Sequence, residues 1–270
     1  MNNQISGNSA WKNPQHNMEV IMKKTHSFHF TGAIALIITL ASCAVLTAPR
    51  DLPPPKAYVP DEPVFAHQKG TFTDQRDGKT YETVEIGTQT WMAENLNYNA
   101  QNSKCYGDDE ANCQEYGRLY NWSTAVALTD CNDLNKSCLS QISEKHKGVC
   151  PDGWHIPRDA EWATLVGFAG ANAGIRLKAS RGWSVYKGSD SYGFAALPGG
   201  SYGFTLDGKG SFYDIGKAGL WWTSTSLHGM FTIDYTYSYE MNDNGYVYKR
   251  VSQKTNSTPD LFYSVRCVQD

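Results

Sequence analysis

The stretch 150–162, CPDGWHIPRDAEW, constrains the fold of this chain more than any other part of the sequence. Its Pro-Asp-Gly triplet predicts a tight turn, since each of these residues favours a turn backbone for its own steric reason. Apolar and polar residues alternate over 154–156, which predicts a short half-buried strand whose His155 is packed or faces the surface. Pro157 fits the start of a helix, where its missing N–H costs little, so we expect a helix over about 159–169.

The N-terminal part of the chain has the pattern of a secretory signal. A Met-Lys-Lys start at 22–24 precedes an apolar run over 28–40, which is shorter than the roughly 20 residues that span a bilayer. The run ends in Leu-Ala-Ser-Cys, which resembles a bacterial lipobox, where the signal is cut before the cysteine and the thiol is lipidated. We therefore predict a signal peptide over 22–42, lipidation of Cys43, and a mis-called or removed leader over 1–21. A plain secretory signal with an incidental cysteine is the alternative.

A proline-rich segment follows the predicted lipidation site. Residues 43–70 hold six prolines, three of them consecutive at 53–55. Such a run favours an extended polyproline II conformation with a rise of about 3.1 Å per residue. We interpret this segment as a lipid-anchored spacer, with an ordinary disordered tail as the alternative, and expect the folded domain over 71–270. The expected location is the bacterial cell envelope, at the outer membrane or the cell surface, with the membrane as a partner through the lipid.

The composition of the chain excludes a nucleic-acid partner and favours an extracellular domain. Only 19% of the residues are charged and the formal net charge is −3, so the chain lacks the basic surface that nucleic acids need. Aromatic residues make up 13% of the chain, with 8 Trp and 16 Tyr, beside 24 Gly. This combination is typical of a loop-rich and strand-rich exported domain rather than of a cytosolic helical enzyme.

Six of the seven cysteines remain once Cys43 is set aside, and an even set in an exported domain implies disulfide bonds. Six cysteines allow about 15 connectivities. We favour two pairs that are close in sequence and flank polar loops, and a third that joins the central stretch to the last apolar strand. The expected pairs are Cys105–Cys113, Cys131–Cys138 and Cys150–Cys267. A zinc or redox site is the alternative, which neither a C-x-x-C motif nor histidines at ligand spacing support.

Several other segments have strand or helix patterns. The strongest is the period-two alternation over 231–241, followed by an Asn-Gly turn and a return strand over 246–251. Further strands, with turns between them, are expected at 71–74, 80–86, 89–96, 117–122, 192–200, 202–204, 220–224 and 264–268, the last of which closes the sheet. Ser123 is expected to cap a helix over 124–128, which joins the helix over 159–169 as the second short helix.

Groups of titratable residues that indicate catalysis or metal binding are weak in this sequence. Glu94 and Glu161 are candidates for the acid–base pair of a glycoside hydrolase. Glu161, however, lies beside Trp162 near a helix start, where a carboxylate is stabilised without any catalytic role. The acidic run at 108–110 lacks the alternating oxygen ligands of a calcium-binding loop, so we interpret it as a solvated loop. We therefore expect no enzymatic activity, no cofactor and no metal.

Flat aromatic side chains in glycine-rich loops are the best candidates for ligand contacts. Such rings stack on sugars or partner side chains and combine apolar area with a polar group. The candidates are Trp183, Tyr186, Tyr192, Tyr202, Tyr213 and Tyr235. Trp183, Tyr186 and Tyr202 lie among Gly, Ser and Lys, so we expect them to be exposed, whereas core packing is the alternative for the tyrosines. Trp154, Trp221 and Trp222 are expected in the core.

Five stretches together resemble one family, the Fibrobacter succinogenes major paralogous domain. They are IGTQTWMAENL at 86–96, GRLYNW at 117–122, CPDGWHIP at 150–157, GLWWTS at 219–224 and SVRCV at 264–268. The resemblance covers the region from about residue 71 to residue 270. It implies a protein of gut or rumen bacteria that is exported and often lipidated. The biochemical role of the family is largely unassigned, so the resemblance indicates location rather than activity.

More distantly, the order of helix, Trp-rich strand and closing Arg-Cys strand is similar to C-type lectin-like and sulfatase-modifying-factor folds. This implies an α+β, C-type lectin-like domain with two short helices, twisted antiparallel strands and long glycine-rich and aromatic loops, whose ends meet in a disulfide such as Cys150–Cys267. Calcium-dependent lectins use Glu-Pro-Asn or Gln-Pro-Asp followed by Trp-Asn-Asp. Here the strand reads WTS at 222–224 and no such tripeptide precedes it, so a calcium sugar site is not expected. Sulfatase-modifying enzymes use a cysteine pair in their active cleft, whereas the six cysteines here have structural uses.

The sequence therefore favours an exported, lipid-anchored, non-catalytic binding module for surface polysaccharide or adhesion. The alternative is a structural or protein–protein interaction domain of the cell envelope, with an envelope protein as its partner. An enzyme related to the sulfatase-modifying factors is a third class, and it requires a free thiol or a pocket around clustered carboxylates. The identity of the ligand stays open at this stage.

Overall fold

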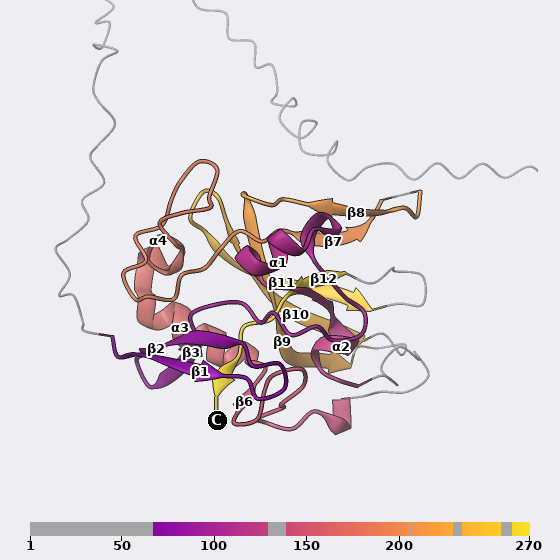
Figure 1. Ribbon diagram of the computed structural model, residues 1–270, viewed down its shortest axis with the longest axis horizontal. Helices are drawn as coiled ribbons and strands as arrows, with labels where there is room; N and C mark the ends of the chain where they lie inside the picture. Colours follow the sequence, from indigo (N-terminus) through magenta and orange to yellow (C-terminus); the bar gives the residue numbers. More distant parts are fainter. Residues whose placement is uncertain (1–66, 129–138, 206, 229–233, 255–260) are drawn as a thin grey trace, which may run out of the picture. The chain divides into compact units, whose positions relative to one another are not determined.

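Two β-sheets form the framework of the computed structural model (Figure 1). The structure describes residues 67–128, 139–205, 207–228, 234–254 and 261–270, all of which belong to one unit, Pro60–Asp270. Nearly all strand pairs are antiparallel and the helices are short, so the predicted α+β class is confirmed. None of the helices in these ranges has the length and apolar character needed to cross a bilayer.

The first sheet has five strands, all paired antiparallel. Their order across the sheet is β1 (Lys69–Thr73), β2 (Thr80–Ile86), β3 (Gln89–Met92), β13 (Val268–Gln269) and β6 (Trp154–His155). The bounds of β2 are those predicted, and the adjacent residues Thr83 and Val84 are both buried, so its two faces are each partly covered. Gly78 supplies the left-handed backbone (φ +75°) that the turn between β1 and β2 requires.

The second sheet is the larger one and contains a single parallel pair, β9 with β12. Its order is β11 (Val247–Lys254), β10 (Asp234–Asn242), β9 (Ala218–His228), β12 (Phe262–Ser264), β5 (Leu119–Asn121) and β4 (Ser103–Lys104). A hairpin of β7 (Ser201–Phe204) and β8 (Gly210–Tyr213) joins the sheet through β12. The predicted hairpin of β10 and β11 is confirmed, with its turn at Gly245 (φ +81°). Residues 231–233, the start of the predicted strand over 231–241, lie outside the described part of the chain.

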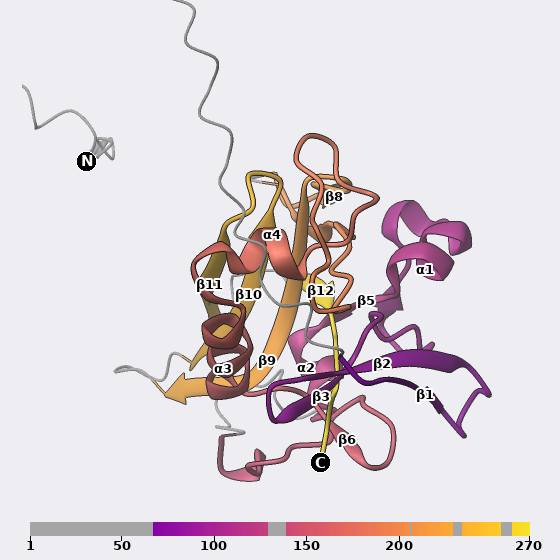
Figure 2. The ribbon, with the colours of Figure 1, turned by 90° about the vertical axis from the view of Figure 1, so that its left-hand side faces the viewer.

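The segment 264–268 corrects the sequence analysis, because it is not one strand that closes one sheet. Ser264 ends β12 in the second sheet, whereas Val268 begins β13 in the first. Between them the carbonyl oxygen of Val265 accepts a hydrogen bond from the amide of Leu96 at 2.9 Å. Figure 2 shows this yellow segment passing from one sheet to the other. A run of apolar residues predicts burial but does not predict a change of sheet.

Four α-helices are described, where the sequence predicted two. The helix α3 (Asp159–Ala169) has the predicted bounds, and the Glu161 carboxylate accepts a hydrogen bond from the Arg158 amide at 2.8 Å to cap its start. The predicted second helix begins earlier, as α2 (Trp122–Ala125), because the Asn121 side chain rather than Ser123 accepts the hydrogen bond from the Thr124 amide. The helices missed from sequence are α1 (Glu110–Tyr116) and α4 (Ala173–Leu177).

Two of the three predicted disulfide bonds are confirmed, Cys105–Cys113 and Cys150–Cys267. The third, Cys131–Cys138, lies outside the described residues. The Cys150–Cys267 bridge is fully buried in one apolar cluster together with Trp154 and Trp222. A second cluster forms around Trp91, Trp162 and Trp221. The prediction that Trp154, Trp221 and Trp222 are core residues is therefore confirmed.

Candidate functional site

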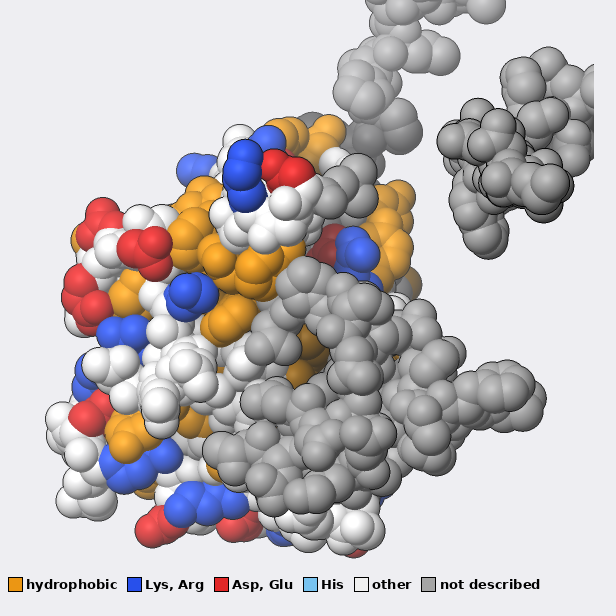
Figure 3. Space-filling model, turned by 90° about the vertical axis from the view of Figure 1, so that its right-hand side faces the viewer, with side chains coloured by type: hydrophobic (Ala, Val, Ile, Leu, Met, Phe, Trp, Pro, Cys, Tyr) orange, Lys and Arg blue, Asp and Glu red, His pale blue; other side chains and the backbone are white. Residues whose placement is uncertain are grey.

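The β7–β8 hairpin carries a group of aromatic rings that we call the aromatic face. It consists of Tyr106, Tyr202, Phe204, Phe212 and Phe262. Tyr202 and Phe212 are directly opposite in the hairpin, so strand pairing places both rings on one side. Figure 3 views the side of the molecule on which this hairpin lies and shows hydrophobic side chains gathered there with few charged ones.

The rings around Tyr202 pack edge to face, and all the rings of the aromatic face except buried Phe262 remain partly accessible. The ring centroid of Tyr202 lies 4.9 Å from that of Phe212 and 5.3 Å from that of Phe262. The ring planes of Tyr202 and Phe262 are perpendicular. The Lys104 ammonium lies 4.7 Å from the centroid of the Tyr202 ring. Phe204 is 38% exposed, while Tyr202 is half-buried. Aromatic area with one cation beside it suits stacking on a sugar ring or a partner side chain.

Two of the predicted ligand contacts are core residues, so the expectation that Trp183 is exposed is wrong. Trp183 is only 4% exposed, and its Nε1 donates a hydrogen bond to the carbonyl oxygen of Ala196 at 3.0 Å. The ammonium of buried Lys178 lies 3.9 Å from the centroid of its ring. Tyr192 is also buried, against His67 and Phe168. Polar neighbours in the sequence do not reveal that these two rings fill the core.

Buried Lys178 explains how the loop that carries Trp183 is held in place. Its ammonium donates hydrogen bonds to the carbonyl oxygens of Tyr186 at 2.6 Å and of Asn242 and Asp243 at 3.1 Å each. Burial lowers the pKa of Lys178 to about 8. These contacts join the loop after α4 to the turn between β10 and β11.

The other predicted aromatic contacts do not gather at one place. Tyr186 is 59% exposed in the loop after α4, as expected. Tyr213 is exposed at the end of β8, but it neighbours Phe212 in the strand and therefore points to the opposite side of the hairpin from the aromatic face. Tyr235 belongs to β10, and its side chain lies outside the described part of the structure. Only Tyr202 of the six candidates belongs to the aromatic face.

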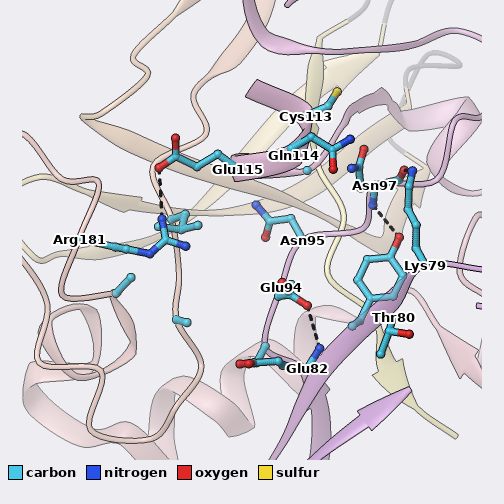
Figure 4. A pocket seen from close by; sticks show the side chains of 16 residues that line it. Lys79, Thr80, Glu82, Glu94, Asn95, Asn97, Cys113, Gln114, Glu115 and Arg181 are labelled. Atoms are coloured by element: carbon cyan, nitrogen blue, oxygen red, sulfur yellow. Dashed lines mark hydrogen bonds and ion pairs between the residues drawn. The ribbon is translucent and has the colours of Figure 1, made fainter. Parts of the chain in front are cut away.

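A second candidate site is a polar cleft of about 350 Å³ (Figure 4). Its walls are β2, the segment after β3, helix α1 and the loop after α4. We call it the polar cleft. The lining residues with polar side chains are Lys79, Thr80, Tyr81, Glu82, Glu94, Asn95, Asn97, Gln114, Glu115 and Arg181. Sequence analysis identified only Glu94 among them, because the others come from segments far apart in the chain.

Hydrogen bonds position the side chains of the polar cleft. The Glu94 carboxylate accepts a hydrogen bond from the amide of Glu82 at 2.8 Å, which brings the two acidic residues together on one side of the cleft. On another side, Arg181 and Glu115 form an ion pair at 3.2 Å. The side-chain oxygen Oδ1 of Asn97 is buried and has no hydrogen-bond partner.

The floor of the polar cleft rests on a buried guanidinium. Arg266 is fully buried, and its Nε and Nη2 donate hydrogen bonds to Oδ1 of Asn95 at 3.0 and 2.8 Å. The same oxygen accepts a hydrogen bond from the Trp221 indole at 2.8 Å. Burial lowers the pKa of Arg266 to about 9. Asn95 is therefore held rigidly, and the chain on either side of it has little freedom to move.

Tyr81 lies in the wall of the cleft that β2 forms. Its hydroxyl oxygen accepts a hydrogen bond from the amide of Asn97 at 3.1 Å. Burial of the ring raises the pKa of Tyr81 to about 12, so its hydroxyl keeps its proton at neutral pH. This side chain orders the segment that presents Asn97.

The predicted acid–base candidates Glu94 and Glu161 serve separate parts of the molecule. The carboxylate of Glu161 is hydrogen-bonded to Nε2 of His155 at 2.9 Å. The carboxylate of Asp270 is hydrogen-bonded to Nδ1 of the same ring at 2.8 Å. Glu161 does not line the polar cleft. No cleft or hydrogen bond among the described residues brings the two carboxylates together. His155 is packed, one of the two alternatives that its sequence left open.

The acidic run at 108–110, predicted to be a solvated loop, has a structural use. Asp109 caps α1 by accepting a hydrogen bond from the amide of Ala111 at 2.9 Å, and Glu110 pairs with Arg118 at 3.2 Å. Within the described ranges, the one group of three metal-type donors is Cys105, Glu110 and Cys113. Both of its sulfurs are joined in a disulfide, so neither offers the thiolate that binds a metal.

No curated protein and no solved structure matches this chain. The family model described as the Fibrobacter succinogenes major domain matches residues 84–269, more than half of the chain. The matched region includes the five stretches on which the resemblance rested, both described disulfides and the residues of the aromatic face. This protein belongs to the Fibrobacter succinogenes major domain family.

Proposed function

We propose that this protein is an exported, lipid-anchored and non-catalytic module that binds polysaccharide through its aromatic face. The observation that carries the proposal is the group of partly exposed rings around Tyr202, with Lys104 beside it. Sugars present flat C–H faces that aromatic rings cover, and they present hydroxyls that a neighbouring charged group can bind. The signal pattern at 22–42, Cys43 and the proline-rich spacer support an attachment to the cell envelope.

The proposal includes a C-type lectin-like arrangement of the domain. Three features support it: the helix α3, the long loops between α4 and β7, and the disulfide that joins Cys150 to Cys267 near the end of the domain. The strand β9 reads WTS at 222–224 and lacks the residues of the calcium sugar site. Ligand binding in this domain is therefore proposed to be independent of calcium.

The test is sedimentation of residues 44–270, which lack the predicted signal and lipidation site, with insoluble cellulose, xylan, chitin and peptidoglycan. We expect at least one polysaccharide to retain the protein. Phe204→Ala should weaken this binding about two- to tenfold, because one aromatic contact is worth roughly 0.5–1.5 kcal/mol. The matched control is Tyr246→Ala, which removes an aromatic side chain that is 59% exposed beside β11.

The proposal fails if none of the polysaccharides retains the protein, or if Tyr246→Ala weakens retention as much as Phe204→Ala does. Thermal unfolding of each variant shows whether the fold is intact. This measurement separates a lost contact from a lost structure.

An envelope protein is the alternative partner for the same surface. The edge-to-face packing of half-buried Tyr202 and exposed Phe204 favours it, because the two rings form an uneven surface that side chains of a partner can contact. Retention by polysaccharide argues against this alternative. An enzymatic role has less support, since the four cysteines in the described ranges are all bound in disulfides.

A further inference from the structure

We propose that the polar cleft is a second binding site, which takes an amino sugar, a hexose ring that carries a protonated amine. The proposal deepens the proposed function, on which it rests for the sugar class, by naming a ligand feature. It depends on different residues, because the polar cleft and the aromatic face share no side chain. The two sites can therefore be tested separately.

The charge of the cleft favours a cationic ligand. Arg181 is paired with Glu115, and Lys79 lies 3.4 Å from Asp77, so both basic side chains of the cleft already have a carboxylate partner. Among the described residues, no lysine or arginine lies within ion-pair distance of Glu82 or Glu94, while the buried guanidinium of Arg266 under the cleft interacts with Glu94 at longer range. A protonated amine placed between these two carboxylates would gain charge-assisted hydrogen bonds.

The second observation is independent of charge and points to a hydrogen-bond donor. Asn97 lines the cleft, is only 7% exposed, and its Oδ1 has no partner. Buried polar atoms in native proteins nearly always have a partner, so a buried acceptor in the wall of a cavity indicates a missing donor. A ligand hydroxyl or amine supplies that donor. Figure 4 shows Asn97 and Gln114 near each other at this end of the cleft.

The shape and composition of the cleft favour a sugar over other cations. A volume of about 350 Å³ falls in the range of small-ligand sites, which begins at roughly 300 Å³. The lining is more polar than apolar, and six of its sixteen residues carry the carboxylate or amide groups that bind hydroxyls. Among the described residues, the three glutamates of the cleft do not bring their oxygens within 4.8 Å of one another, as a metal ion requires.

The cleft is also rigid before any ligand binds, which reduces the entropy lost on binding. Gly117 lines it with a left-handed backbone (φ +75°), and a Cβ atom there would lie 2.7 Å from Cβ of Asn95. Only glycine allows this close approach. Asn95 itself is held by Arg266 and Trp221, so the neighbouring Glu94 projects from a fixed backbone.

The experiment is calorimetric titration of the full chain carrying Cys43→Ser with chitosan oligosaccharides, which bear free amines. Matched probes are chitin oligosaccharides, whose amines are acetylated, and cellulose oligosaccharides, which have none. We expect the amine probe to bind about tenfold more tightly than either, since one charge-assisted contact is worth over 1.4 kcal/mol. The advantage should disappear as the pH rises through the pKa of the sugar amine, and it should shrink in high salt.

Glu82→Gln and Glu94→Gln should each remove most of that advantage while keeping the size of the side chain. The matched control is Glu85→Gln, which makes the same change of charge on the same strand β2 but outside the cleft. It should leave the affinity unchanged.

The inference is overturned if the three probes bind equally, if Glu85→Gln weakens binding as much as Glu82→Gln, or if binding requires calcium. A lysine-containing peptide that binds more tightly than the amine sugar also overturns it. Retention on an insoluble polysaccharide, combined with no preference for the amine probe, rejects the second site and leaves the proposed function standing. Preference for the amine probe, combined with no retention on any insoluble polysaccharide, rejects binding at the aromatic face and leaves the second site standing.

Discussion

At the scale of single residues, His155 is the side chain whose role sequence reasoning understated. It is almost fully buried between the carboxylates of Glu161 and Asp270. Burial lowers the pKa of the imidazole, but the hydrogen bonds and charges of the two carboxylates outweigh this effect, so the pKa lies above its ordinary value of 6.5. For Glu161, burial raises the pKa, but the hydrogen bond with His155 prevails and the pKa lies below 4.5. The three groups join β6, α3 and the segment after β13.

This network predicts a pH dependence of stability. A raised histidine pKa contributes stability that is complete below pH 6.5 and is lost as the pH rises through the folded-state pKa. A lowered glutamate pKa contributes stability that is present above pH 4.5 and is lost as the pH falls through its folded-state pKa. The contribution of the pair is therefore greatest between pH 4.5 and 6.5. Urea unfolding across this range measures it.

The control for this prediction is His155→Gln, which keeps a polar side chain but cannot titrate. The difference in unfolding free energy between the natural chain and the variant should be largest between pH 4.5 and 6.5 and smaller at pH 8. Two parallel profiles would falsify the account of a charged imidazole.

At the scale of elements, the change of sheet between β12 and β13 organises the domain. Arg266 lies in this crossing, and its guanidinium reaches Asn95 under the polar cleft. The next residue, Cys267, forms the bridge to Cys150 in the turn before β6. The same short segment thus connects both sheets, both apolar clusters and the floor of a candidate site. An amphipathic pattern in the sequence cannot reveal this, because β12 and β13 are each only two or three residues long.

The two described disulfides should contribute different amounts of stability. The Cys150–Cys267 bridge spans 117 positions and Cys105–Cys113 spans 8. Chain entropy predicts a loss of about 4–5 kcal/mol when the first is replaced by two alanines, and about 2–3 kcal/mol for the second. Urea unfolding of the two double variants gives the comparison. An equal loss from both would show that local packing, rather than loop closure, determines the effect.

At the scale of the whole molecule, the N-terminal pattern predicts how the domain is presented. Lipidation of Cys43 followed by the proline-rich spacer would hold the domain away from a membrane surface, with both candidate sites accessible. The domain begins with β1 at Lys69, slightly before the family match at residue 84. The predicted spacer and lipidation site therefore lie outside the matched region.

The anchor leads to a direct test in cells. The natural chain, expressed in a bacterium that lipidates proteins, should incorporate labelled fatty acid and sediment with the membrane fraction. Cys43→Ser should abolish the label, because it removes the thiol that carries the lipid. Incorporation of label into the Cys43→Ser variant would contradict the predicted lipidation site.

The candidate sites show how far sequence reasoning reaches in this protein. Glu94 was singled out, but Glu82, Asn97 and Arg181 were not, because each is an unremarkable polar residue within its own segment. Tyr202 was expected to be exposed and is half-buried, whereas Trp183 is buried, since its burial depends on Lys178 and on contacts across the loop. Composition near a residue indicates exposure only where no distant segment covers it.

By itself the sequence determined the local features: the turn and strand after Cys150, the helix α3, the hairpin of β10 and β11, and the pairing of Cys150 with Cys267. These follow from backbone preferences and alternation between neighbouring residues, or from cysteine chemistry. Only the tertiary structure decided the change of sheet and the assembly of the polar cleft. Both depend on contacts such as that of Asn95 with Arg266, 171 positions apart, and no local preference encodes which distant segments meet.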